Sequence, residues 1–334
     1  MIAAWAAVGA VGAAAGPPLG GLLVQASWRW VFLVNVPLGL VSLWYAARHV
    51  AESRDPASRG LPDLAGTLAL MAGIGSLILA LVKGREWGWG SAPTVLALAL
   101  AAVLVAVTVV RSLRHPVPVL EPSILRVPSF AFAIASALAF FTAFGAMLLS
   151  GVLFLTGVWG HSILRAGLEL APGPIAALVF AVVASRVGPR LGMATVGAVG
   201  GLLVATGLAC NAVRLEVAPD YLGAFLPGQL ISGAGVGLAM PAFTAVAVTA
   251  VSARRFSTAI GISSMFRQVG GALGVAAFVA IVGTPTRGAA IESYRHGWYF
   301  MIVAATIGSL FMLAARFAPR PASAPQPEPA RTPA

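Results

Sequence analysis

Apolar stretches of about 20 residues recur along the whole chain, and each is long enough to cross a hydrocarbon layer of about 30 Å. Only 9% of the 334 residues are charged and 59% are hydrophobic, whereas soluble domains usually contain about 25% charged residues. The stretches cover residues 3–24, 30–47, 64–82, 92–110, 130–158, 165–187, 193–213, 221–248, 259–283 and 298–317. The sequence therefore predicts an all-α polytopic membrane protein with about ten transmembrane helices.

The positions of the basic residues predict how these helices are oriented. When the first stretch is taken to run outward from the cytoplasm, the cytoplasmic side holds thirteen Lys or Arg residues and the other side holds seven, with Arg267 inside a stretch. Because Lys and Arg prefer cytoplasmic loops, we expect both chain ends in the cytoplasm and the protein in the cytoplasmic (inner) membrane. The same preference explains the formal charge of +11. No basic run with interleaved aromatic residues occurs, so nucleic-acid binding is not expected.

Residues 111–129 interrupt the apolar pattern. Pro116, Pro118, Pro122 and Pro128 prevent one continuous helix there. We expect this segment to be a cytoplasmic connection between two groups of helices. The tail at 318–334 is rich in Pro and Ala, and its composition predicts disorder.

The first apolar stretch carries a glycine-rich motif. Its glycines are Gly9, Gly12, Gly16, Gly20 and Gly21. At about 100° per residue, the first four lie within about 80° of arc, so one helix face is nearly free of side chains and admits another helix at close range. Pro17 removes a backbone hydrogen bond in mid-helix and bends or loosens that turn. The spacing alone favours an ordinary packing face between membrane helices.

The order of these residues is more specific than their spacing. The segment GAAAGPPLGG at 12–21 resembles the antiporter motif GxxxGPxxGG on the fifth helix of exporters in the major facilitator superfamily. The segments SWRWVF at 27–32 and NVPLG at 35–39 are similar to the start of the sixth helix in its fourteen-helix drug:proton antiporter family. Later segments resemble that family in the same order, namely DLAG at 63–66, EWGWG at 86–90, GHS at 160–162, AGL at 166–168, RVGPR at 186–190 and RQVGGALG at 267–274.

This resemblance implies a partial major-facilitator fold that covers helices five to fourteen. Helices one to four, and the membrane carboxylate that such families carry near the start, are then expected to lie outside this sequence. The chain divides into 1–50 as the last two helices of the N-terminal bundle, 51–62 as a cytoplasmic loop, 63–110 as two linking transmembrane helices, 111–129 as the cytoplasmic connection, 130–317 as a six-helix C-terminal bundle and 318–334 as a disordered cytoplasmic tail.

The function that the resemblance implies is secondary active transport. The chain is expected to export small lipophilic compounds across the cytoplasmic membrane by proton antiport, with substrate, membrane lipid and a proton as partners and with no cofactor. The residues expected to form the conformational gate are Gly12, Gly16, Pro17, Gly20 and Gly21. The alternative is a truncated, non-transporting remnant or a partner of another membrane protein.

Six residues are candidates for a substrate cavity. Phe141, Phe144 and Met147 offer aromatic and thioether surface for lipophilic cations or neutral drugs, although lipid-facing or packed positions are the commoner reading. Thr156 stands where the family usually has Gln, which places a polar contact in doubt. Arg267 and Gln268 belong to the RQVGGALG segment and are expected either to face the cavity or, for Arg267, to extend toward the cytoplasmic headgroups.

The sequence offers little support for metal binding or enzymatic activity. All ten acids are predicted in loops or at helix ends, and Asp63 is read as a helix N-cap. Four histidines in separate loops, without a carboxylate partner in sequence, and one cysteine predict no metal site. Five tryptophans are read as an interfacial belt, namely Trp28, Trp30, Trp87, Trp89 and Trp298. No hydrolase or nucleotide-binding motif occurs, so the chain is not expected to be an enzyme.

Overall fold

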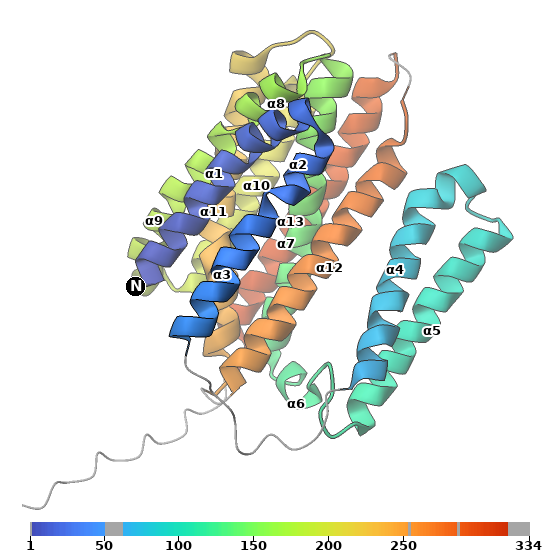
Figure 1. Cartoon of the computed structure of the whole chain (residues 1–334), viewed down its shortest axis with the longest axis vertical. Coiled ribbons are helices and arrows are strands. Elements are labelled where there is room, and N and C mark those ends of the chain that lie inside the picture. The colour runs from blue at the N-terminus through green and yellow to red at the C-terminus, as the bar shows by residue number, and fades with distance from the viewer. Residues whose placement is uncertain (1, 51–62, 253–254, 286–287, 320–334) are drawn as a thin grey trace, which may run out of the picture.

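A computed structural model of the chain describes residues 2–50, 63–252, 255–285 and 288–319, which are helical apart from short connections (Figure 1). The helices before the proline-rich connection are α1 (Ile2–Ala26), α2 (Trp28–Leu33), α3 (Asn35–His49), α4 (Leu64–Trp87) and α5 (Ala92–Arg114). The later ones are α6 (Pro122–Leu125), α7 (Pro128–Leu153), η1 (Phe154–Val158), α8 (Ile163–Leu170), α9 (Pro172–Leu191), α10 (Met193–Arg214), η2 (Tyr221–Phe225), α11 (Leu226–Thr249), α12 (Phe256–Val282) and α13 (Ala290–Phe317).

Nine helical segments within the described residues are long and apolar enough to cross a membrane. They correspond to nine of the predicted stretches, from Trp28–His49 to Ala290–Phe317. The prediction of an all-α polytopic membrane protein is therefore confirmed. The helix α1 adds 25 residues before these segments, and its role as a further span stays a prediction.

The central bundle consists of α7 and α9 to α13. Its helices α10 and α11 are held together by glycines. A methyl group placed on Gly200 of α10 would lie 2.6 Å from the carbonyl oxygen of Gly235 on α11. Gly207 on α10 is equally close to the backbone of Gly228 on α11. Without side chains at these positions the two backbones approach each other directly, which is how membrane helices gain packing contacts in lipid.

The pair α7 and α12 is packed in the same way by the RQVGGALG segment. A methyl group on Gly270 would lie 2.5 Å from the carbonyl oxygen of Leu138, and one on Gly274 would clash with the backbone of Thr142. Since Gly270 and Gly274 are one turn apart, they share the face of α12 that contacts α7. This contact fixes which residues of α12 face the interior of the bundle.

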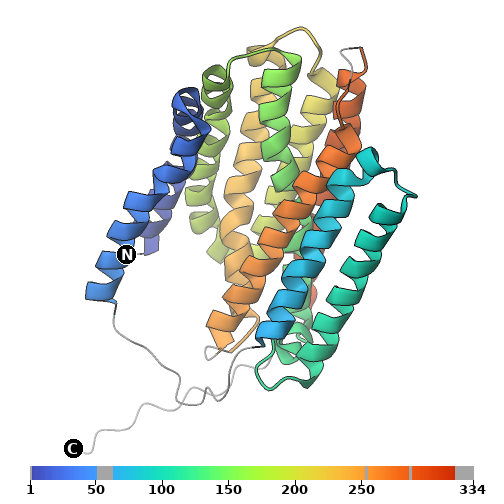
Figure 2. The ribbon, with the colours of Figure 1, turned by 45° about the vertical axis from the view of Figure 1, so that its right-hand side comes forward.

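Two groups of helices flank this bundle on opposite sides. The helix α1 packs against α8 and α9, and the α4–α5 hairpin packs against α12 (Figures 1 and 2). The short helices α2 and α3 contain no buried residue. The flanking helices expose large apolar side chains, as surfaces in contact with lipid do.

Several helix boundaries differ from those predicted. The helix α5 continues four residues beyond 110 to Arg114, and α13 begins at Ala290 rather than near 298. Placing Trp298 in an interfacial belt was wrong, because this residue is 2% exposed and its Nε1 donates a hydrogen bond to the Ser150 hydroxyl at 3.1 Å. His296 likewise lies within α13 and not in a loop. The polar residues of the first two turns of α13 make that segment resemble a loop in sequence.

The division of the chain into bundles, loops and tail stays a prediction, and residues 51–62 and 320–334 lie outside the described residues.

Candidate functional site

An aromatic cluster lies at the contact between α7 and α11. Phe140, Phe141 and Phe144 of α7 meet Phe243 of α11, with ring centroids 5.0 Å apart for Phe140 and Phe243 and 5.6 Å apart for Phe141 and Phe243. Phe141 and Phe144 are 5.8 Å apart in an edge-to-face arrangement, which aromatic pairs favour. Sequence reasoning missed Phe243, because its meeting with α7 depends on helix packing and not on any local motif.

Arg267 of α12 joins this cluster. Its guanidinium carbon lies 5.1 Å from the centre of the Phe141 ring, a distance at which the ring attracts a cation. Its Nε is buried and has no hydrogen-bond partner in the described structure. Arg267 precedes Gly270 by one turn, so the glycine contact with α7 also places the charge beside Phe141. Two of the predicted cavity residues, Phe141 and Arg267, are thus in contact.

The remaining cavity candidates are less closely associated. Phe144 belongs to the cluster, and Met147 is half-buried against the same core. Gln268 follows Arg267 but is exposed. Thr156 lies in the π-helical turn η1, where its hydroxyl donates to the Val152 carbonyl at 2.8 Å. It lies nine residues beyond Met147, which corresponds to about 13 Å along a helix, and the structure does not bring it to the cluster.

An apolar groove lies outside the aromatic cluster. It has a volume of about 390 Å³ and is formed by side chains of α4, α7, α12 and α13. No charged residue and none of the six cavity candidates lines it. The groove is therefore separate from the aromatic cluster.

The glycine motif on α1 presents two different faces. Methyl groups added at Gly12, Gly16 and Gly20 would meet no atom within 4 Å, whereas one at Gly21 would lie 3.1 Å from the carbonyl oxygen of Ile163 at the start of α8. On the opposing helix, a methyl group at Gly167 would lie 2.6 Å from the carbonyl oxygen of Pro17. Gly21, Pro17 and Gly167 therefore make the close contact between α1 and α8. No described residue covers the face of the other three glycines.

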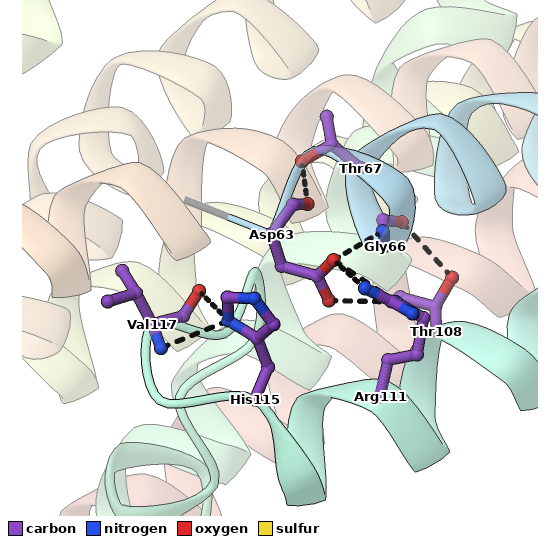
Figure 3. Close-up of polar contacts among 7 residues, drawn as sticks. All are labelled: Asp63, Gly66, Thr67, Thr108, Arg111, His115 and Val117. Atoms are coloured by element: carbon purple, nitrogen blue, oxygen red, sulfur yellow. Dashed lines mark hydrogen bonds and ion pairs between the residues drawn. The ribbon is translucent and has the colours of Figure 1, made fainter. Parts of the chain in front are cut away.

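An ion pair joins the ends of α4 and α5. The Asp63 carboxylate caps α4 as predicted, because its Oδ1 accepts a hydrogen bond from the Gly66 amide at 2.8 Å (Figure 3). Arg111 in the last turn of α5 also donates to this carboxylate, with Nη2 2.6 Å from Oδ1 and Nε 3.1 Å from it. The Arg111 bonds, followed by that from Gly66, hold the pKa of Asp63 below its ordinary value. The sequence predicted that Asp63 caps a helix, but it did not predict that Arg111 binds the same carboxylate.

A second polar cluster surrounds Glu169 of α8. Its carboxylate lies 2.7 Å from His161 Nδ1 and accepts a hydrogen bond from Arg165 Nε at 2.9 Å, and its backbone carbonyl accepts one from the Tyr221 hydroxyl at 2.9 Å. No carboxylate partner of His161 was expected from the sequence, and in the structure Glu169, eight residues later, lies beside it. No group of three or more potential ligands that would suit a metal ion occurs within the described residues.

The profile of the Major Facilitator Superfamily matches residues 1–275, which is most of the chain. The chain belongs to the major facilitator superfamily. This superfamily consists of membrane transporters, and the relatives described next are transporters or resistance proteins and not enzymes.

Among similar proteins of the superfamily is the multidrug resistance protein Stp of Mycobacterium tuberculosis, which is 34% identical over 283 residues that cover 84% of this chain and 52% of that protein. The cephamycin export protein CmcT of Amycolatopsis lactamdurans is 34% identical over 304 residues, 87% of this chain and 60% of that protein. The methylenomycin A resistance protein of Streptomyces coelicolor is 28% identical over 309 residues, 90% of this chain and 64% of that protein. The chain thus spans about half to two thirds of the length of these curated relatives.

Proposed function

We propose that the chain takes part in the export of small lipophilic compounds across the cytoplasmic membrane. The observation that carries this proposal is the aromatic cluster of Phe140, Phe141, Phe144 and Phe243 with Arg267 beside it, within a membrane bundle of the major facilitator superfamily. Aromatic side chains bind apolar compounds through large contact areas, and a charged residue inside a membrane bundle is typical of a transport pathway. Relatives named for multidrug resistance and for cephamycin export support the export of small organic compounds.

The transported compound would move as the bundles change their relative positions. In this proposal the glycine motif of α1 is the conformational gate, because the contacts of Gly21 with Ile163 and of Gly167 with Pro17 join α1 to α8 without intervening side chains. A helix contact of this kind can slide or open without repacking large side chains. Gly12, Gly16 and Gly20 form a second helix face without side chains, against which another helix can pack closely during transport.

A proton is the proposed coupling ion, and both chain ends are proposed to be cytoplasmic. Support for the proton comes from the resemblance to drug:proton antiporters. Asp63 is paired with Arg111 at a helix end and lies outside the aromatic cluster, so it is not our candidate for carrying the coupled proton. The orientation rests on the excess of Lys and Arg on one side of the predicted topology.

Uptake into everted membrane vesicles tests this function. Vesicles from cells that produce the chain should accumulate a fluorescent lipophilic compound when they are energised, and collapse of the pH gradient with an ionophore should abolish the accumulation. Vesicles without the chain provide the baseline. Accumulation at that baseline, with the chain demonstrably inserted in the membrane, would contradict the proposal.

The second candidate is a membrane protein that packs against another one and does not transport by itself. It is favoured by the open face of Gly12, Gly16 and Gly20 and by the absence of buried residues in α2 and α3. Recovery of a defined membrane partner in stoichiometric amount, together with baseline uptake, would support this candidate.

A further inference from the structure

A small polar cavity lies between α11 and α12, beside the aromatic cluster. Thr244 and Ala247 of α11 and Ile260, Ser263, Ser264 and Arg267 of α12 line it. Its volume is about 10 Å³, which is close to the space that one water-sized species needs. One positive charge and three hydroxyl groups therefore converge on a space for a single atom or a small terminal group.

The polar groups of this cavity are not satisfied by one another. Arg267 Nε is buried without a hydrogen-bond partner, and in the described part of the chain the hydroxyls of Thr244, Ser263 and Ser264 make no side-chain hydrogen bond. Some helical hydroxyls of the bundle donate back to their own helix, as Thr249 does to the Ala245 carbonyl at 2.8 Å. The hydroxyls at the cavity are thus available as donors to something inside it.

The charge of Arg267 also lacks a counter-ion. Within the described residues it belongs to none of the ion pairs, which are formed by Lys83, Arg111, His161, Arg165 and Arg255. It lies eleven residues into α12, about 16 Å along the helix axis, where a bilayer provides no water to screen it. The Phe141 ring offers its partly negative face to the cation. A ring face carries no net charge, so no group of opposite charge among the described residues balances Arg267.

The chemistry of the cavity selects among possible occupants. A cation is repelled by Arg267, whose guanidinium already covers the Phe141 ring that a cationic compound would use. A water molecule can accept hydrogen bonds from the guanidinium and the hydroxyls but leaves the charge unbalanced. An anionic group accepts from all of these donors and also balances the charge.

We propose that the cavity formed by Arg267, Ser263, Ser264 and Thr244 binds one singly charged anionic group, supplied either by the carboxylate of an amphipathic compound or by a halide ion. The apolar part of such a compound would lie against the half-buried ring of Phe144, which is adjacent to Phe141. That this compound is a transported substrate rests on the proposed export function, whereas binding of the anion itself does not. Lipophilic cations, one of the two ligand classes expected from sequence, are disfavoured beside Arg267.

Thermal unfolding of the purified full chain in detergent micelles tests the proposal with three probes. Sodium octanoate supplies a carboxylate on an apolar chain, n-octanol supplies the same chain without charge, and sodium chloride supplies a halide alone. Each is titrated in one low-chloride buffer against wild type and Arg267→Gln. Arg85→Gln is the matched control, because Arg85 is an exposed arginine of α4 that also forms no ion pair among the described residues.

Octanoate should raise the unfolding temperature of wild type and Arg85→Gln, and its apparent affinity should fall about tenfold or more in Arg267→Gln, as loss of charged hydrogen bonds predicts. Octanol should act equally on all three proteins. A chloride effect that is lost in Arg267→Gln and that competes with octanoate assigns the halide as the source. Equal octanoate affinity in wild type and Arg267→Gln, or no response of wild type to either anion, would overturn the proposal.

A second variant covers the case in which Arg267→Gln does not fold. The double substitution Ser263→Ala and Ser264→Ala keeps the charge and removes two donors, and it should weaken octanoate binding several-fold without changing the octanol response. Unchanged octanoate affinity in this variant counts against the site. Failure of vesicle uptake with octanoate binding intact would contradict the export function but not the anion site.

Discussion

Arg111 in the last turn of α5 binds the buried Asp63 carboxylate at the start of α4, with Nη2 2.6 Å from Oδ1 (Figure 3). The two residues are 48 positions apart, and their contact closes the α4–α5 hairpin at one end. The same carboxylate caps α4 through the Gly66 amide. One side chain thus serves both the end of its own helix and the pairing of two helices.

This contact predicts a specific pH dependence. The pKa of Asp63 is lowered mainly by the Arg111 hydrogen bonds, so the ionised carboxylate stabilises the hairpin fully above the unfolded value of about 3.9. That stabilisation should be lost as the pH falls through the lower folded pKa. The protection factors of the α4 and α5 amides, which compare their exchange with that of the unfolded chain at the same pH, should therefore fall in strong acid in wild type.

The substitution Asp63→Asn should make that exchange fast at neutral pH and remove its acid dependence. The control is Glu86→Gln, because the exposed pair of Lys83 and Glu86 belongs to a class that contributes little. If Asp63→Asn exchanges like wild type at pH 7, the ion pair does not hold the hairpin together.

Neighbouring glycines of α12 should respond differently to the same substitution. Gly274→Ala introduces a methyl group against the Thr142 backbone, whereas Gly271→Ala meets no atom within 4 Å. The first should lower the free energy of unfolding by about 1–3 kcal/mol through overpacking, and the second should not lower it. Thermal unfolding in detergent compares them, and equal stabilities would show that α7 and α12 are not in close backbone contact.

The buried hydrogen bond between Trp298 and Ser150 predicts a measurable loss of stability. Ser150→Ala leaves the indole N–H without a partner inside the bundle, which should cost about 1–3 kcal/mol. Ser185→Ala removes an exposed hydroxyl that bonds only to its own helix and serves as the control. Similar unfolding temperatures for the two variants would place Trp298 outside the core.

The glycines at the α1 contact are expected to have two roles, one in packing α1 against α8 and one in the proposed gate. Gly167→Leu should displace α1 from α8, because Gly167 faces the Pro17 carbonyl, and Gly16→Leu should not, because Gly16 faces open space. Disulfide cross-linking between Pro18→Cys and Leu164→Cys, in a Cys210→Ala background, measures this packing. Both substitutions should abolish vesicle uptake while leaving membrane insertion intact. Normal uptake by Gly16→Leu would remove the open glycine face from the gate.

The sequence predicts the membrane class of this fold well because apolar length is a local property. Each span is recognised by its own residues, and the glycine segments at 12–21 and 267–274 identify helices with close neighbours. The Asp63 cap is also local and is confirmed. Long-range contacts such as Arg111 with Asp63, Phe243 with Phe141 and His161 with Glu169 depend on how helices meet. Trp298 was misplaced because polar residues lie in the first turns of its helix.

The aromatic cluster should also be distinguishable from other buried aromatic residues by function. Phe141→Ala and Phe278→Ala remove the same side chain from the bundle, but only Phe141 contacts Arg267, whereas Phe278 packs against Tyr294. Both should be destabilised by about 3–5 kcal/mol. Vesicle uptake, corrected for the amount of folded chain, should fall only in Phe141→Ala. An equal fall in both variants would indicate a structural effect alone.

Substrate protection of a single cysteine tests most directly whether the cluster holds the transported compound. In a Cys210→Ala background, Phe144→Cys places a thiol in the cluster, and Leu148→Cys places one at an exposed position one turn further along α7. The account predicts that a compound accumulated by the vesicles slows maleimide labelling of Phe144→Cys, in proportion to its occupancy, and leaves labelling of Leu148→Cys unchanged. Equal labelling of Phe144→Cys with and without a saturating concentration of that compound would contradict it.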